Sequence, residues 1–145
     1  MAEDDAARVR RLLARLRDSG ELTYSLEMPD VGERNPLDVF LFDARRGHCE
    51  YFSTAMTVML RTLGVPARNV TGFLGGRYNA YGRYYALSQG DAHSWVEAWL
   101  PGEGWVTVDP TPPARDDIAP DPGIFATLRE VIDALRTRWS QDVVG

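Results

Sequence analysis

The chain has 145 residues, a length that suits one domain and is short for two. Hydrophobic residues make up 44% and charged residues 26%, which is the composition of a globular protein rather than of a disordered tail. Sixteen basic and twenty-one acidic residues give a formal net charge of −5, which argues against a nucleic-acid-binding protein, because such proteins carry a basic face. All sixteen basic residues are arginine, so Schiff-base and P-loop lysine chemistry are excluded.

The chain has a single cysteine, Cys49, which excludes an internal disulfide and any zinc or iron–sulfur site that needs several cysteines. No run of apolar residues approaches the roughly 18 that a membrane-spanning helix needs, and no apolar signal-peptide region precedes the first predicted helix. We therefore expect the domain itself to be soluble.

The N-terminal segment is predicted to form an amphipathic helix that ends at Gly20, the position where a left-handed C-cap residue is usual. Its apolar residues recur at helical spacing. They are Val9, Leu12, Leu13 and Leu16. Residues 21–28 are predicted to form a short strand or an extended arm, and residues 29–36 an exposed, turn-rich loop.

A second helix is predicted after Gly47 and ends before Gly64 and Pro66. Its apolar residues again follow helical spacing. They are Phe52, Met56, Met59, Leu60 and Leu63. This assignment places Cys49 in the first turn of a buried helix.

The second half of the chain is predicted to be mainly strand. Residues 67–74 form one strand and lead into a segment rich in glycine and tyrosine. Two further strands, 93–100 and 105–109, are joined by Pro101–Gly104, whose two glycines are typical of a hairpin connection.

The C-terminal part is predicted to begin with an irregular connector over residues 110–122, which contain five prolines. A last helix, about 122–139, begins at Asp121 and Pro122, an N-cap followed by proline at the first helical position. We expect a single domain over residues 1–145, with a core at about 20–112. Helices at both ends of an antiparallel sheet predict an α+β fold.

The predicted position of Cys49 suggests chemistry. A thiol in the first turn of a helix meets the positive end of the helix dipole, which favours the nucleophilic thiolate. This signal is weak by itself, because a lone cysteine is more often a small buried hydrophobic residue.

The predicted hairpin strengthens the signal. On strand 93–100 the residues Val96, Ala98 and Leu100 share one face, and His93, Trp95, Glu97 and Trp99 share the other. On strand 105–109 the aliphatic face is Val106 and Val108, and the opposite face is Trp105, Thr107 and Asp109. Matching the aliphatic faces puts His93 and Asp109 on the same side of the sheet, near the open end of the hairpin. A carboxylate that accepts the Nδ1–H of an imidazole, with a thiol nearby, is the arrangement of a Cys-His-Asp triad.

Four sequence blocks resemble the transglutaminase-like core family, and their order and spacing make the resemblance specific. The blocks are Gly47–Phe52, Leu63–Arg68, Asp91–Glu97 and Gly104–Thr111. The resemblance runs from about Arg8 to Gly145 and is greatest to the bacterial membrane-tethered subgroup, whose catalytic domain lies outside the cytoplasmic membrane. It implies a domain excised from a longer membrane protein, located on the periplasmic face of the inner membrane.

The resemblance implies a papain-like fold in which the helix that carries the cysteine packs on an antiparallel sheet. It makes Cys49 the nucleophile, His93 the general acid and base, and Asp109 the residue that orients His93. The sequence departs from the large animal transglutaminases in two respects. It lacks a calcium-loop pattern, and no tryptophan precedes Cys49 to stabilise an oxyanion.

Three further residues are candidates for substrate binding: His48, Trp95 and Tyr81. Each also has a structural interpretation, since His48 could only shape the turn, Trp95 could be ordinary packing, and Tyr81 could belong to a surface hairpin. Asp91 is a rival carboxylate for His93, but we expect it to cap the entry of the strand. A zinc site built from His48, Cys49, His93 and an aspartate is disfavoured, because adjacent residues rarely bind one metal together.

Two classes of function follow. In the first, Cys49 attacks a protein or peptide glutamine carboxamide, and the thioester is resolved by an amine (a transglutaminase) or by water (a cysteine peptidase or amidase). In the second, the chain is a non-catalytic interaction module. The intact set of Cys49, His93 and Asp109 favours an enzyme with a protein or peptide substrate. We expect no cofactor and no metal, and the sequence does not indicate an oligomeric state.

Overall fold

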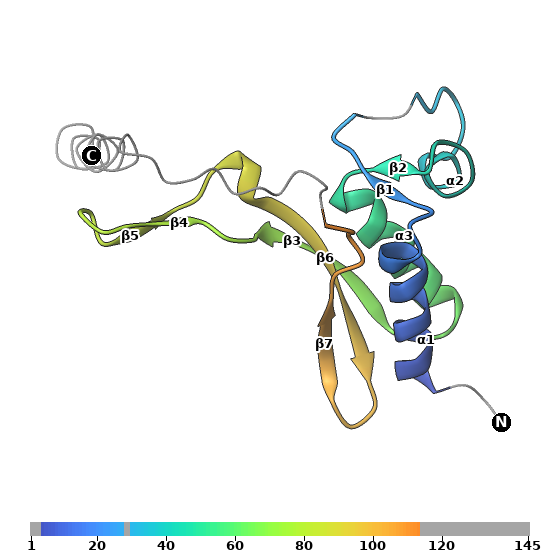
Figure 1. The fold of residues 1–145 in the computed structure, drawn as a ribbon. Helices are drawn as coiled ribbons and strands as arrows, with labels where there is room; N and C mark the ends of the chain where they lie inside the picture. Colours follow the sequence, from blue (N-terminus) through green and yellow to red (C-terminus); the bar gives the residue numbers. More distant parts are fainter. Residues whose placement is uncertain (1–3, 28–29, 114–145) are drawn as a thin grey trace. The chain divides into compact units, whose positions relative to one another are not determined.

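The computed structural model describes residues 4–27 and 30–113 (Figure 1). The described residues divide into two compact units, the first formed by residues 4–27, 30–72 and 93–113 and the second by residues 73–92. The helix predicted at about 122–139 lies outside the described residues. In the described part of the chain, no helix is both long enough and apolar enough to cross a membrane.

The first unit begins with the predicted amphipathic helix, α1 (Asp5–Leu13), which continues as a π-helical segment, η1 (Ala14–Asp18). Its buried residues, Val9 and Leu16, belong to the predicted apolar stripe. The chain then leaves the helix through Gly20 at a φ of +73°, a left-handed conformation that glycine adopts without strain. Helix α1 packs against α3 (Figure 1).

Helix α3 (Cys49–Thr62) forms the centre of the core. Phe52, Met56 and Leu60 are fully buried at the helical spacing that the sequence predicts. Leu63, which the prediction placed in the same stripe, lies after the end of the helix and is 46% exposed. The chain turns at Gly64, whose φ of +81° explains why the helix stops there.

A three-stranded sheet packs beside α3 in the order β3 (Ala67–Phe73), β6 (Ala92–Leu100) and β7 (Gly104–Val108) (Figure 1). Strands β6 and β7 form the predicted antiparallel hairpin, in which Val96 is opposite Val108 and Ala98 is opposite Val106. Val96 and Ala98 are fully buried and pack into the core. This register confirms the predicted faces of the hairpin.

Near the start of α3 the structure has a strand where a short strand or an extended arm was predicted, and two helices that were not predicted. Strand β1 (Thr23–Tyr24) lies within the predicted 21–28 arm and pairs in parallel with β2 (Arg46–Gly47). Between them, where no helix was predicted, the chain forms α2 (Pro36–Asp38) and the π-helical η2 (Val39–Ala44). These helices bury Phe40, whose ring lies edge-on to that of Phe52, with 4.9 Å between the ring centroids.

The described part of the second unit is a hairpin of β4 (Arg77–Asn79) and β5 (Tyr84–Ala86), followed by a short 3-10 helix, η3 (Gln89–Asp91). The glycine- and tyrosine-rich segment therefore forms a hairpin. The side chain of Asn79 shapes its turn by accepting hydrogen bonds from the backbone N–H groups of Tyr81 and Gly82.

Candidate active site

Cys49 is the first residue of α3, and His48 is the N-cap residue. The His48 Nδ1 atom accepts a hydrogen bond from the backbone N–H of Glu50 at 3.4 Å. Its ring lies edge-on to Tyr51, with 5.3 Å between the centroids. The Cys49 side chain is half-buried and forms no disulfide. The predicted nucleophile therefore begins the helix as the sequence indicates.

A pocket of about 350 Å³ lies beside the first turn of α3. It is lined by Pro36, Leu37, His48, Glu50, Tyr51 and Thr54. His48 therefore both shapes the turn and lines a pocket, so the two interpretations of this residue do not exclude each other. A larger cavity of about 760 Å³ lies between the β1 region and Pro112–Pro113, and the lining of neither cavity includes Cys49, His93 or Asp109.

His93 and Asp109 are in direct contact. The Nε2 atom of His93 lies 2.7 Å from Oδ2 of Asp109, and their side chains are 16% and 33% exposed, so the pair is partly sheltered from water. The other carboxylate oxygen, Oδ1, accepts a hydrogen bond from the backbone N–H of Thr111 at 2.9 Å. Both oxygens of Asp109 are thus held, and the carboxylate has a fixed orientation. The second contact was not predicted, although an Asp two residues before a backbone donor in a turn is a recognisable signal.

The nitrogen that contacts Asp109 differs from the one we predicted. The sequence-based interpretation had the carboxylate accept the Nδ1–H of His93, whereas the structure places Nε2 against it. The reason is the register, because Asp109 follows Val108, the partner of Val96, and so lies diagonally from His93, within reach of the far side of the ring. An ionised carboxylate can only accept a hydrogen bond, so Nε2 carries the proton, and a neutral His93 has its lone pair on Nδ1.

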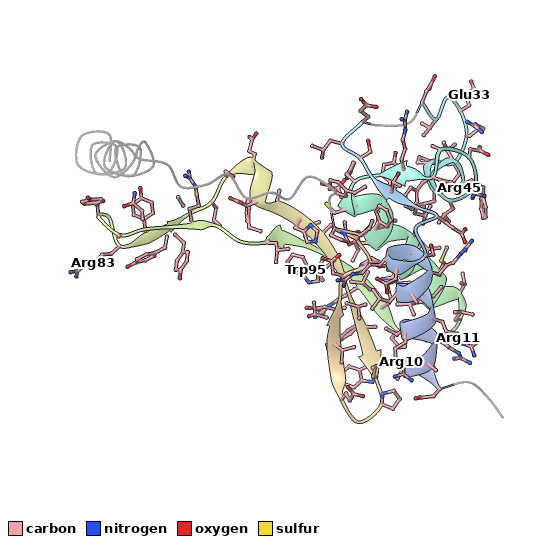
Figure 2. All side chains as sticks on the ribbon, in the orientation of Figure 1. Arg10, Arg11, Glu33, Arg45, Arg83 and Trp95 are labelled. Atoms are coloured by element: carbon pink, nitrogen blue, oxygen red, sulfur yellow. The ribbon has the colours of Figure 1, made fainter. Side chains whose placement is uncertain are left out.

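Trp95 lies beside the His93 ring. The two rings are stacked with an interplanar angle of 24° and a centroid separation of 6.3 Å. The Trp95 side chain is labelled in Figure 2. Its indole also lies against Gly72 of β3, where a Cβ atom would be only 2.7 Å from the ring. Glycine at position 72 therefore lets Trp95 lie flat against the sheet beside His93.

Helix α3 and strand β6 run in the same direction, which places Cys49 and His93 at the same end of the two elements. At one end, Ser53 Oγ of α3 lies 2.7 Å from Ser94 Oγ of β6. At the other end, the Arg61 side chain binds the Ala67 carbonyl and the Trp99 N–H donates to the Pro66 carbonyl. Cys49 lies one turn before Ser53, and His93 immediately precedes Ser94.

Asp91 is used locally, as the sequence analysis expected. Its Oδ2 atom accepts hydrogen bonds from the backbone N–H of Ser88 at 2.6 Å and from the Ser88 hydroxyl at 2.8 Å, which completes a capping box on η3. These hydrogen bonds, with a smaller contribution from Arg77, hold the pKa of Asp91 below its usual range.

Tyr81 is 61% exposed, in the turn between β4 and β5 of the second unit. The candidate binding residues His48 and Trp95 belong to the first unit, with Cys49, His93 and Asp109.

Within residues 4–27 and 30–113, no group of three or more His, Cys, Asp or Glu side chains is arranged to hold a metal ion.

Comparisons with known proteins show the family of the chain. The model of the transglutaminase-like superfamily matches residues 1–110. The protein-glutamine gamma-glutamyltransferase of Pseudomonas aeruginosa is 48% identical over 88 residues, which cover 61% of this chain and 13% of that protein. The uncharacterized protein YebA of Bacillus subtilis is 41% identical over 99 residues, which cover 64% of this chain and 13% of that protein. The chain therefore spans a small part of the length of these relatives.

The fold is similar to that of the periplasmic domain of TgpA from Pseudomonas aeruginosa, in its crystal structure with ethylmercury. The TM-score is 0.66 at 43% identity, and the match covers 76% of this chain and 38% of that chain. This likeness confirms the predicted α+β, transglutaminase-like fold and agrees with the predicted bacterial subgroup. Because the family model matches the chain from its first residues to the hairpin that pairs His93 with Asp109, the chain belongs to the transglutaminase-like superfamily.

Proposed function

We propose that the protein is a cysteine acyltransferase that acts on glutamine carboxamides of proteins or peptides, with Cys49, His93 and Asp109 as its catalytic triad. The observation that carries the proposal is the 2.7 Å contact between His93 Nε2 and Asp109 Oδ2. It gives the imidazole a fixed orientation and leaves the Nδ1 lone pair to act as a base. The start of α3 supplies the thiol, at the end of the helix that favours its ionised form.

In the proposed mechanism, Nδ1 of His93 takes the thiol proton of Cys49, and the thiolate attacks the carboxamide carbon. A C–S bond forms, the carbonyl oxygen becomes an oxyanion, and the imidazolium remains hydrogen-bonded to Asp109. The imidazolium then gives its proton to the departing amide nitrogen, so that ammonia leaves and a thioester remains. An entering primary amine gives its proton to Nδ1 as it attacks, and Cys49 leaves as the thiolate.

The outcome of the second step depends on the nucleophile that reaches the thioester. An amine yields transamidation, and water yields deamidation of the glutamine or, with a peptide bond as the first substrate, proteolysis. The name of the Pseudomonas aeruginosa relative, protein-glutamine gamma-glutamyltransferase, favours the amine. The pocket beside His48 and the indole of Trp95, which lies beside His93, are the candidate contacts for the acyl donor.

The likeness to a periplasmic domain also supports a proposal about location. We infer that residues 1–145 form one transglutaminase-like domain of a longer, membrane-tethered protein and face the periplasm.

The test is incubation with a glutamine-containing peptide and a labelled primary amine, followed by intact-mass measurement of peptide and enzyme. We expect the peptide to gain the mass of the amine less that of ammonia, and we expect Cys49→Ala to abolish the gain. The chain has no lysine, so its own side chains supply no primary amine that competes with the labelled amine as acyl acceptor. Conversion of the glutamine to glutamate, or cleavage of the peptide, would favour the hydrolytic alternative. An unchanged peptide and no enzyme adduct would favour the non-catalytic interaction module.

The proposed chemistry uses only protein groups, so we expect turnover to be undiminished in excess EDTA. The measurement is the initial rate of amine incorporation after dialysis against EDTA, compared with the same enzyme dialysed against buffer. A loss of rate that Ca²⁺ or Zn²⁺ restores would contradict the mechanism, whereas a loss that no metal restores would indicate damage during dialysis.

A further inference from the structure

Four polar side chains from three elements form one hydrogen-bonded network at the junction between α3 and the sheet. Ser53 Oγ lies 2.7 Å from Ser94 Oγ, and Ser94 Oγ lies 2.8 Å from Asn69 Oδ1. The Nδ2 group of Asn69 donates back to α3, to Thr54 Oγ1 at 3.1 Å. The network therefore begins and ends on α3, one turn after Cys49, and its middle is the residue that follows His93.

The two serines lie in the core. Ser53 is 0% exposed and Ser94 is 1% exposed, and the buried residues beside them on the two elements, Phe52, Met56 and Val96, are apolar. A purely apolar contact between helix and strand allows small shifts of one against the other, because it is not directional. Hydrogen bonds of 2.7–2.8 Å are directional and permit little sliding. Each buried hydroxyl costs free energy unless it is paired, so the network stabilises one relative placement of α3 and β6.

We propose that Ser53 and Ser94 are positioning residues that hold the thiol of Cys49 in register with the Nδ1 atom of His93. This inference rests on the proposed function, in which the two groups exchange a proton. Cys49 precedes Ser53 by one helical turn and His93 precedes Ser94 by one residue, so a shift at the serine pair moves the reacting groups relative to each other. The serines act through Cys49 and His93 and contact no reacting atom.

The directions of the hydrogen bonds indicate which variants keep the fold. Ser94 donates its only hydroxyl proton to Asn69 Oδ1, so Ser53 is the donor in the serine pair. Replacement of Ser94 with alanine leaves Ser53 within 3.3 Å of the Glu50 carbonyl, and exposed Asn69 can bind water. Replacement of Ser53 with alanine leaves Ser94 with both Asn69 and the Val70 carbonyl, which is 3.3 Å away. Neither change leaves a buried hydroxyl without a partner.

Thr57 provides a matched control. It lies on α3 one turn after Ser53 and is 5% exposed, and its hydroxyl has no hydrogen-bond partner among the residues that the structure describes. Thr57→Val removes a buried hydroxyl from the same helix while it leaves the connection to β6 intact. We expect this variant to melt at or above the temperature of the wild type.

The experiment compares the wild type, Ser94→Ala, Ser53→Ala, Thr57→Val and His93→Ala by the rate at which iodoacetamide labels Cys49 between pH 5 and pH 9. We expect Ser94→Ala to lose about 10-fold to 10²-fold in rate at pH 6, because misplacement by about 1 Å has effects of this size. We expect its rate to approach that of the wild type at pH 9, where a thiol ionises without help. Thr57→Val should be labelled at the same rate as the wild type at every pH between 5 and 9.

The outcomes separate the two proposals. If the labelling rates of the wild type and His93→Ala are the same at every pH, then His93 is not the base for Cys49 and the proposed function is wrong. If the wild type is labelled faster than His93→Ala at pH 6 and both serine variants are labelled at the rate of the wild type, the proposed function is supported and the positioning role is wrong. A purely structural role would lower the melting temperature of the serine variants without a change in the pH profile, and that result would also overturn the proposal. If Ser94→Ala does not fold, Ser53→Ala decides.

Discussion

His93→Ala is expected to lower the rate of amine incorporation by about 10²–10⁴-fold, the usual contribution of a general acid–base residue. The imidazole is the group proposed to take the thiol proton, and its orientation depends on the 2.7 Å contact with Asp109. Alanine removes the base and leaves the carboxylate held by the Thr111 N–H. The same variant should label slowly with iodoacetamide at pH 6, because a thiol without a base beside it is mostly protonated at that pH.

The chain offers two features that make this measurement sharp. Cys49 is the only cysteine, so each labelling event reports on one thiol without peptide mapping. The chain has only two histidines, and the second, His48, adjoins Cys49, so His48→Asn is a matched comparison that keeps a side chain able to cap α3. We expect His48→Asn to change the labelling rate far less than His93→Ala does. The reverse order would assign the base to His48 and contradict the proposed triad.

The hairpin could be predicted from the sequence because its signal is local and has a period of two. Aliphatic residues alternate with polar and aromatic ones on both strands, and two glycines mark the turn between them. Matching the aliphatic faces predicts which residues share a side of the sheet, and the structure confirms these faces with Val96 opposite Val108. Once the register is known, the approach of His93 to Asp109 follows from strand geometry.

The segment before α3 could not be predicted as readily. Residues 39–42 are four consecutive apolar residues, Val-Phe-Leu-Phe. Such a short run fits a buried strand as well as a helix. The deciding signal is at Asn35 and Pro36, where Asn35 accepts the Leu37 N–H and caps the helix. The parallel pairing of β1 with β2 joins residues more than twenty positions apart, and two-residue strands carry too little pattern to indicate a partner.

Details of the site that depend on three-dimensional contacts were also beyond the sequence. The pattern placed a carboxylate beside His93 but named the wrong ring nitrogen, because the choice depends on the diagonal offset between the strands. Nothing in the residues around Ser53 and Ser94 indicates that these two hydroxyls meet, since they are separated by 41 positions and serine is common in many environments. Contacts of this kind appear only when the helix and the strand are packed together.

Asp109→Asn is expected to lower the rate of amine incorporation by about 10²–10⁴-fold while it preserves the fold and the melting temperature. The aspartate accepts hydrogen bonds at both oxygens, from the Thr111 N–H at Oδ1 and from His93 at Oδ2. An asparagine has one oxygen and one NH₂ group, and the NH₂ group can only donate. If the oxygen stays with the Thr111 N–H, the NH₂ group faces Nε2, which must then give up its proton. The proton moves to Nδ1, the atom that the mechanism needs as a base. If the asparagine side chain takes the flipped orientation, its NH₂ group faces the backbone N–H of Thr111, and two donors oppose each other.

Asp91→Asn is the matched comparison, because it makes the same chemical change at the rival carboxylate two residues before His93. A single oxygen of Asp91, Oδ2, accepts both hydrogen bonds from Ser88, and the carbonyl oxygen of an asparagine can accept the same two. We therefore expect a small effect on the rate of amine incorporation and on iodoacetamide labelling at pH 6. Both variants are measured by these two rates and by thermal unfolding. If Asp91→Asn silences Cys49 and Asp109→Asn does not, then Asp109 is not the residue that orients His93, even though the two side chains are 2.7 Å apart.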